Sequence, residues 1–270
     1  MPLSVPPTFG QLQMTHLGPG TPADGITVTA GGTAHTKGAW TQLIASTSYD
    51  TYGMWVAVRG IHVSGSATPY LVDIGVGPSG SEQVLIPNLN VWGAENLGPS
   101  IRAFFFPVYV PAGSRIVARS QSATASKTCA VMVVLDGVPW YGSWGVGPVV
   151  DYGTDLAASR GTSVTPGNGA WGSWVSLGTT SRDHTFWTVS MDGLADTSLS
   201  GTYYLVEVGV GPSGAQQSLG FLRIRTTTAE LIGDSFPLFL SSRPVPAGTQ
   251  VWVRMASGST EARGVIVYAM

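Results

Sequence analysis

The sequence is poor in charge, in cysteine and in helical patterning. Asp, Glu, Lys and Arg make up only 10% of its 270 residues, against roughly 25% in typical soluble domains. The net charge is −2 and no basic patch stands out, so nothing supports nucleic-acid binding. The single cysteine, Cys129, excludes an internal disulfide, and its apolar neighbours predict an ordinary buried thiol.

Long apolar runs and targeting signals are missing as well. No window approaches the roughly 18 uninterrupted apolar residues of a membrane-spanning helix, so we expect no membrane span. Residues 1–7 lack a charged region followed by an apolar run, so we expect no signal peptide.

Glycine, proline and aromatic residues are abundant instead, with 36 Gly, 18 Pro, 9 Trp, 9 Tyr and 8 Phe. The aromatic and β-branched residues supply material for burial, which argues against disorder. So little charge on a folded protein favours a subunit buried in an assembly over a free enzyme.

One sequence segment occurs twice. Residues 70–80 read YLVDIGVGPSG and residues 204–214 read YLVEVGVGPSG. The VPAG of residues 110–113 returns at 245–248, and the GAW of residues 38–40 returns as GSW at 172–174. These three pairs of matching segments, each separated by 134 or 135 residues, predict two tandem copies of one domain.

Domain 1 contains about eight short runs of β-branched and aromatic residues bounded by turn residues, with no convincing helical period, and domain 2 repeats their order. This pattern predicts a sandwich or barrel. We therefore predict an all-β fold of two tandem antiparallel β-sandwich, jelly-roll-like domains related by an internal repeat.

The predicted organisation has four parts. An extended N-terminal arm (1–24) is rich in Pro, which disfavours helix, and is expected to lie on a partner or on the first domain. Domain 1 (25–136) and domain 2 (162–270) are joined by an aromatic, Gly/Pro-rich connection (137–161). A flexible linker would carry no aromatics, so we expect the connection to pack.

The repeated glycine-rich segment is interpreted as a hairpin turn. It satisfies G-x-G-x-x-G spacing, but a strand pattern follows, whereas dinucleotide binding requires a helix there. A nucleophilic serine is disfavoured because the same turn recurs in both copies. The residues assigned to structural turns are Gly75, Gly77, Pro78, Gly80, Pro111, Gly113, Gly209, Gly211, Pro212, Gly214, Pro246 and Gly248.

The titratable residues do not form a catalytic or metal-binding pattern. The histidines are dispersed, without metal-ligand spacing, so no metal or cofactor is expected; they are His16, His35, His62 and His184. No G-x-S-x-G nucleophile motif is present.

Among the acidic residues, Asp73 and Glu207 share one repeat position, and we expect each to pair with Arg or to cap a turn. Glu82 has Gln216 opposite it, and Glu95 lies in a loop. We therefore predict a non-enzyme. A glycan-degrading enzyme, which needs two carboxylates within about 5–10 Å of each other, is the alternative.

Several tryptophans could form a ligand or partner surface. The chosen candidates are Trp92, Trp140, Tyr141 and Trp144, with Trp171 and Trp187 as further candidates for a sugar-binding face. Trp40, Trp55 and Trp174 lie in strand patterns and are expected in the core.

Two segments resemble sequences found in virion structural proteins of tailed bacteriophages, particularly minor tail proteins of phages with actinobacterial hosts. They are residues 71–89 (LVDIGVGPSGSEQVLIPNL) and 110–116 (VPAGSRI). The resemblance covers most of domain 1, whereas domain 2 lacks the SEQVLIPNL part. It implies a non-enzymatic virion component assembled in the host cytoplasm, at the tail tip or a fibre.

Capsid decoration and a carbohydrate-binding module for the host surface are the alternatives. The implied partners are other virion proteins, a host-surface glycan and further copies of the chain, with a trimer favoured by analogy.

Overall fold

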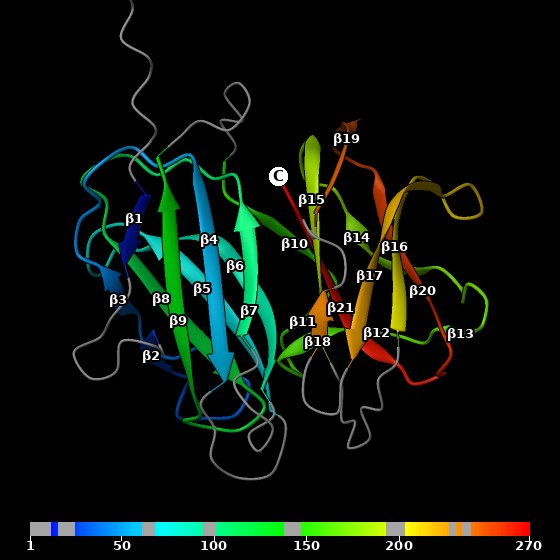
Figure 1. Cartoon of the computed structure of the whole chain (residues 1–270), viewed down its shortest axis with the longest axis horizontal. Helices are drawn as coiled ribbons and strands as arrows, with labels where there is room; N and C mark the ends of the chain where they lie inside the picture. Colours follow the sequence, from blue (N-terminus) through cyan, green and yellow to red (C-terminus); the bar gives the residue numbers. More distant parts are fainter. Residues whose placement is uncertain are drawn as a thin grey trace, which may run out of the picture.

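The structure of the chain is a computed structural model (Figure 1). It describes residues 12–15, 25–60, 68–93, 101–137, 147–192, 203–226, 231–233 and 239–270. All regular elements in these ranges are β-strands, and they form four sheets. Figure 1 shows the sheets as two sandwiches side by side, the first coloured blue to green and the second green to red. The predicted all-β class is confirmed.

Sandwich 1 consists of sheets 1A and 1B. Sheet 1A contains β1 (Leu12–Thr15), β2 (Ile26–Thr29), β4 (Gly53–Gly60), β7 (Ile101–Phe106) and β9 (Thr128–Asp136). Sheet 1B contains β3 (Thr41–Ile44), β5 (Thr68–Val76), β6 (Gln83–Gly93) and β8 (Ile116–Ser122).

Sandwich 2 consists of sheets 2A and 2B. Sheet 2A contains β10 (Val150–Tyr152), β11 (Thr154–Asp155), β12 (Arg160–Val164), β15 (His184–Asp192), β19 (Phe239–Val245) and β21 (Arg263–Ala269). Sheet 2B contains β13 (Gly167–Asn168), β14 (Val175–Thr179), β16 (Tyr203–Val210), β17 (Gln217–Thr226), β18 (Leu231–Gly233) and β20 (Gln250–Ser257).

Both sandwiches follow the same strand order. Sheet 1A runs β2-β9-β4-β7 and sheet 1B runs β3-β8-β5-β6, while sheets 2A and 2B run β12-β21-β15-β19 and β14-β20-β16-β17. In sandwich 1 the eight strands are β2 to β9, and in sandwich 2 they are β12, β14, β15, β16, β17, β19, β20 and β21. Counted in chain order, strands one, eight, three and six form one sheet of each sandwich, and strands two, seven, four and five form the other. This is the arrangement of a jelly roll, in which long connections cross between two antiparallel sheets. β1 and β10 each add a strand beside the last strand, β9 or β21.

The period-2 patterns explain the cores. Along β15 the side chains of Trp187, Val189 and Met191 join the core of sandwich 2. The alternate residues Thr188 and Ser190 point the other way and are nevertheless buried. A strand buried on both faces must be covered by something beyond its own sandwich, and here the cover is sandwich 1.

The predicted arm and connection contain strands. Residues 12–15 of the arm form β1, which pairs with β9 of sandwich 1; residues 1–11 and 16–24 lie outside the described residues. Residues 150–161 of the connection form β10, β11 and the start of β12, and so belong to sheet 2A. Sequence patterning missed these strands because they are only two to five residues long.

Candidate functional site

The two sandwiches share an apolar interface. Strands β10 and β15 lie along β6. Five side chains from residues 147–270 belong to the same buried cluster as the core of sandwich 1, namely Val149, Phe186, Ile266, Tyr268 and Met270. The ring of Tyr268 makes edge contacts with Phe104 and Phe106, with centroids 6.3 and 5.9 Å away.

Polar groups of the two sandwiches form hydrogen bonds with one another at the centre of this interface. The Tyr268 hydroxyl donates to the Asn88 carbonyl and accepts from the Asn90 amide, both at 2.8 Å. The Asn90 side-chain amide donates to Asp192 at 2.9 Å, and the Ser190 hydroxyl donates to the Asn90 carbonyl at 2.6 Å. Because buried hydrogen bonds are directional and costly to leave unmade, they fix how sandwich 2 sits on β6.

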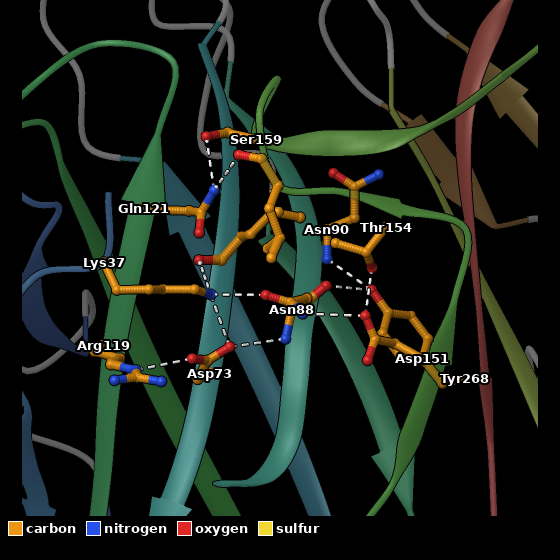
Figure 2. Close-up of polar contacts among 12 residues, drawn as sticks. Lys37, Asp73, Asn88, Asn90, Arg119, Gln121, Asp151, Thr154, Ser159 and Tyr268 are labelled. Carbon is orange, nitrogen blue, oxygen red and sulfur yellow. Dashed lines mark hydrogen bonds and ion pairs between the residues drawn. The ribbon is translucent and has the colours of Figure 1, made fainter. Parts of the chain in front are cut away.

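A charged cluster borders these bonds (Figure 2). The Lys37 ammonium lies 2.7 Å from Asp73 and 2.8 Å from the side-chain oxygen of Asn88. Asn88, in the left-handed conformation (φ 47°), donates its side-chain amide to Asp151 of β10 at 3.0 Å. Burial lowers the pKa of Lys37, and the attraction of Asp73 opposes that shift. Asn88 thus connects the ion pair of sandwich 1 to sandwich 2.

The segment before β12 reaches over β8. The side-chain amide of Gln121 donates to the Leu156 carbonyl at 2.9 Å and to the Ser159 hydroxyl at 3.0 Å. Ser159 also lies 3.0 Å from Nδ1 of His35. This contact extends the interface from β6 onto the outer surface of sheet 1B.

The two acidic residues at the shared repeat position are held by arginines, as expected. Asp73 accepts from Arg119 at 2.8 Å and Glu207 from Arg254 at 2.5 Å. Each guanidinium also lies over a tryptophan, Arg119 over Trp40 at 4.3 Å and Arg254 over Trp174 at 4.4 Å.

Two predictions are corrected here: the core position of the two tryptophans and the turn role of two glycines. Trp40 and Trp174 are half-buried on the outer faces of sheets 1B and 2B, and are not in the cores. Gly75 and Gly209 lie within β5 and β16 and are not turn residues. A Cβ on Gly75 would come within 2.8 Å of Trp40, and one on Gly209 within 2.7 Å of Trp174. Both glycines make room for an indole ring.

The remaining turn residues lie at chain reversals. Gly77, Gly80, Gly211 and Gly214 all have positive φ. In each loop the residue after the second glycine donates to a proline carbonyl at 3.0 Å, Ser81 to Pro78 and Ala215 to Pro212. These turns join β5 to β6 and β16 to β17.

The Pro-Ala-Gly turns, at Pro111–Gly113 and Pro246–Gly248, have partners that the sequence reasoning missed. Thr47 and Thr180 donate to the carbonyls of Pro111 and Pro246, at 2.9 and 2.7 Å. Asp50 and Asp183 accept from the amides of Ala112 and Ala247, at 2.8 and 3.0 Å. A sequence signal existed, because residues 47–50 (TSYD) and 180–183 (TSRD) both read T-S-x-D.

The predicted aromatic surface of Trp92, Trp140, Tyr141 and Trp144 stays a prediction. Trp140, Tyr141 and Trp144 lie outside the described residues, as does the side chain of Trp92, whose backbone belongs to β6. Trp187 is fully buried in sandwich 2, so its assignment to a sugar-binding face is wrong. Trp55, expected in the core, is half-buried on the outer face of sheet 1A beside Phe105, with ring centroids 5.0 Å apart.

An exposed aromatic surface does exist on sheet 2B, and only Trp171 of it was predicted. Phe221 and Tyr203 are 58% and 40% exposed, and Trp171 is 36% exposed. Trp171 contacts Phe221 edge-on at 6.3 Å, and Arg223 lies over Tyr203 at 4.0 Å. A pocket of about 430 Å³ opens beside them, lined by Gly169, Tyr203, Leu205, Arg223, Ala256 and Ser257. We call these residues, with Trp171 and Phe221, the 2B surface.

The carboxylates considered for catalysis are occupied by cations. Asp73 is bound by Lys37 and Arg119. The hydrogen bond from Arg115 lowers the pKa of Glu82, and Glu95 lies outside the described residues. Within the described ranges no cluster of three or more His, Cys, Asp or Glu could hold a metal. No helix there is long and apolar enough to cross a membrane.

Fold and interface together define the class: an all-β chain of two jelly-roll sandwiches joined through a buried interface. No family model and no curated protein matches the chain. Three solved structures give the scale of the structural likeness, which at these scores carries no argument about function. A chain of Sulfolobus turreted icosahedral virus is 10% identical with a TM-score of 0.34, covering 97% of this chain and 90% of that one.

The tandem CBM22-1-CBM22-2 domain of Paenibacillus barcinonensis Xyn10C is 10% identical with a TM-score of 0.29, over 96% of this chain and 92% of that one. A chain of the T=1 Penaeus vannamei nodavirus is 11% identical with a TM-score of 0.24, over 91% and 96%.

Proposed function

We propose that this protein is a non-enzymatic structural component of a virion and works by assembling with other subunits. The observation that carries the proposal is the placement of apolar surface. Both sandwiches leave aromatic side chains half-buried or exposed on a sheet face, Trp55 and Phe105 on sheet 1A and Trp171 and Phe221 on sheet 2B. Exposed apolar sheet faces on a folded protein mark interaction sites.

The low charge and the paired carboxylates support the same proposal. Only 10% of residues are charged, and obligate interfaces are more apolar than transient ones. Asp73, Glu82 and Glu207 are each bound to a basic side chain, which leaves them poorly placed as a general acid and base. The segments 71–89 and 110–116, which resemble phage virion proteins, favour a tailed-phage virion. Within it, we favour a position at the tail tip or a fibre over capsid decoration.

The test is the location of the chain in particles of the phage that encodes it. Antibodies raised against the recombinant protein would be applied to gradient-purified particles and imaged by negative-stain microscopy. We expect labelling at the tail end. Uniform labelling of the head would favour decoration, and absence of the chain from purified particles would overturn the proposal.

A second candidate function is binding of a host-surface glycan. The 2B surface favours it, because exposed Trp171, Phe221 and Tyr203 could stack against sugar rings. Titration of the purified protein with host cell-wall oligosaccharides, compared with a Phe221→Ala variant, tests this. Equal, negligible binding by both proteins would remove the candidate.

A further inference from the structure

Lys37 and Asn88 lie in contact beside a buried carboxylate. The Nζ atom of Lys37 is 2.8 Å from the side-chain oxygen of Asn88 and 2.7 Å from Asp73 (Figure 2). Asp73 also accepts from the backbone amide of Asn88 at 2.9 Å. The side chain of Asp73 is only 4% exposed and that of Lys37 is 18% exposed. An amine, a carboxamide and a carboxylate therefore meet at a place that is largely withdrawn from water.

The side chain of Asn88 is held in one orientation. Its amide nitrogen donates to Asp151 at 3.0 Å, and Asp151 in turn accepts from the hydroxyl of Thr154. The Asn88 carbonyl accepts from Tyr268 at 2.8 Å, and the backbone has a φ of 47°. These contacts point the oxygen of the carboxamide at the lysine. Two reacting groups fixed in contact avoid much of the entropy cost of bringing them together, which lowers the barrier to their reaction.

The surroundings of Lys37 favour its neutral, nucleophilic form. Burial is the main cause that lowers the pKa of Lys37; Arg119 acts in the same direction, and Asp73 opposes both. An ammonium group donates to all three of its acceptors, the third being the Leu71 carbonyl at 3.3 Å. A neutral amine donates to two of them, Asp73 and Leu71, and can turn its lone pair to the carbon of the Asn88 carboxamide. Desolvation activates amine nucleophiles in this way.

The second copy of the repeat keeps the acid–arginine pair of this place and lacks both reacting groups. The pair is present there as Glu207 and Arg254. Trp171 precedes the GSW segment as Lys37 precedes GAW, and Phe221 is the strand partner of Glu207. A sandwich therefore folds with the acid and the arginine alone. The lysine and the asparagine occur together in sandwich 1 and are replaced together in sandwich 2, as expected of two groups with a joint role.

We propose that Lys37 and Asn88 react with each other and form an isopeptide bond inside sandwich 1. The Nζ atom attacks Cγ of Asn88, and the bond between Cγ and Nδ2 breaks. Asp73 takes the proton that Nζ loses and passes it to the leaving nitrogen, which departs as ammonia. One amide bond replaces another, so the reaction needs no oxidant, reductant or activated co-reactant.

The isopeptide bond ties the chain between β2 and β3 to the middle of β6. A covalent cross-link stabilises a fold largely by constraining the unfolded chain, as a disulfide does. Because Asn88 also bonds to Asp151 and Tyr268 of sandwich 2, the link ends at the interface of the two sandwiches. This modification goes beyond the proposed role in assembly and does not depend on it.

The lysine content of the chain makes the test direct, because the sequence has two lysines, Lys37 and Lys127. The purified full chain is denatured, weighed by mass spectrometry and digested with a protease that cleaves after lysine. We expect a mass lower than the sequence mass by one ammonia molecule, and cleavage after Lys127 but not after Lys37. A second protease, which cleaves after aromatic residues, should release a branched peptide that joins Lys37 to Asn88.

Two variants remove one reacting group each. Lys37→Arg keeps a positive charge beside Asp73 but has no nucleophilic amine. Asn88→Gly removes the carboxamide and tolerates the positive φ. Both should keep the full mass of their sequences and unfold at a lower temperature than the wild type, and Asn88→Gly should restore cleavage after Lys37. Circular dichroism checks that both are folded. Lys127→Arg, the matched control away from the site, should form the link as the wild type does.

A wild-type chain that is cleaved after Lys37 and yields no branched peptide would overturn the proposal. A loss of ammonia that persists in Lys37→Arg would overturn it as well, because an asparagine would then have cyclised on its own backbone. Either result leaves the proposed virion role standing, since the labelling of particles tests that role separately.

Discussion

The side-chain amide of Asn90 donates to the carboxylate of Asp192 at 2.9 Å, although the two residues are 102 positions apart and belong to different sandwiches. The same carboxylate accepts from the amides of Gly161 and Gly264, at 3.1 and 3.0 Å. Asp192 is 0% exposed, so its removal leaves three donors without an acceptor.

Asp192→Ala is accordingly expected to lower the free energy of unfolding by about 3–5 kcal/mol, the cost of breaking a buried charged network. Denaturant titration measures the change. Asp183→Ala is the matched control, because Asp183 also accepts a backbone hydrogen bond, but at an exposed turn. We expect less than about 1 kcal/mol there, and equal effects of the two substitutions would contradict the importance of the interface.

Tyr268→Phe removes a hydroxyl that bridges Asn88 and Asn90. It leaves the Asn90 amide unpaired inside the interface, at a cost of about 1–3 kcal/mol. Because this bond joins the sandwiches, calorimetry should show the unfolding transitions of the two sandwiches moving apart. Tyr204→Phe removes a hydroxyl that accepts from Arg263 within sandwich 2. It should lower the midpoint of unfolding without separating the transitions; the same behaviour in both variants would count against coupling through Tyr268.

His184 predicts a dependence of stability on pH. Burial is the main cause that lowers its pKa from 6.5 to about 4, and its Nε2 lies 2.8 Å from the Tyr152 hydroxyl. The unfolded chain therefore binds a proton that the folded chain resists. Stability is full above pH 6.5 and falls as the pH drops towards 4, by roughly 3 kcal/mol in all.

His184→Gln keeps a polar partner near Tyr152 and has no titrating group. Denaturation midpoints between pH 4 and pH 7 should therefore fall less steeply for this variant than for the wild type. Parallel curves for the two proteins would show that other groups account for the acid sensitivity.

Gly75→Ala tests the indole stack. The new Cβ would meet Trp40 at 2.8 Å, and such overpacking costs about 1–3 kcal/mol. Gly75→Ala combined with Trp40→Phe should cost less than the two single changes added together, since a smaller ring leaves space for the methyl group. Thermal unfolding of the four proteins measures the coupling, and strictly additive losses would contradict it.

Local patterns in the sequence predicted much of the fold. The alternation at 26–29 became β2, and the apolar run at 71–76 became most of β5, because strand formation and turn chemistry depend on neighbouring residues. The expected pairing of Asp73 and Glu207 with arginine is also seen. The buried Cys129, whose pKa is raised to about 12 by burial, is likewise as expected.

The interface could not be predicted in the same way. Nothing in the sequence marks Asn88 and Asn90, both within β6, as contact residues. Only the packing of the two sandwiches brings Tyr268 and Asp192 to them. The predicted burial of the tryptophans was wrong for a related reason. Strand patterning assigns a residue to one face of a sheet but does not say whether that face points into the core. Trp40, Trp55 and Trp174 therefore lie on outer sheet faces, and Trp187 lies in a core.

The directional bonds of Asn90 have a geometric consequence. They hold the two sandwiches in one relative orientation. Any partner that touches both sandwiches therefore meets two surfaces whose relative angle is set by Asn90, Tyr268 and Asp192, in the middle of the molecule.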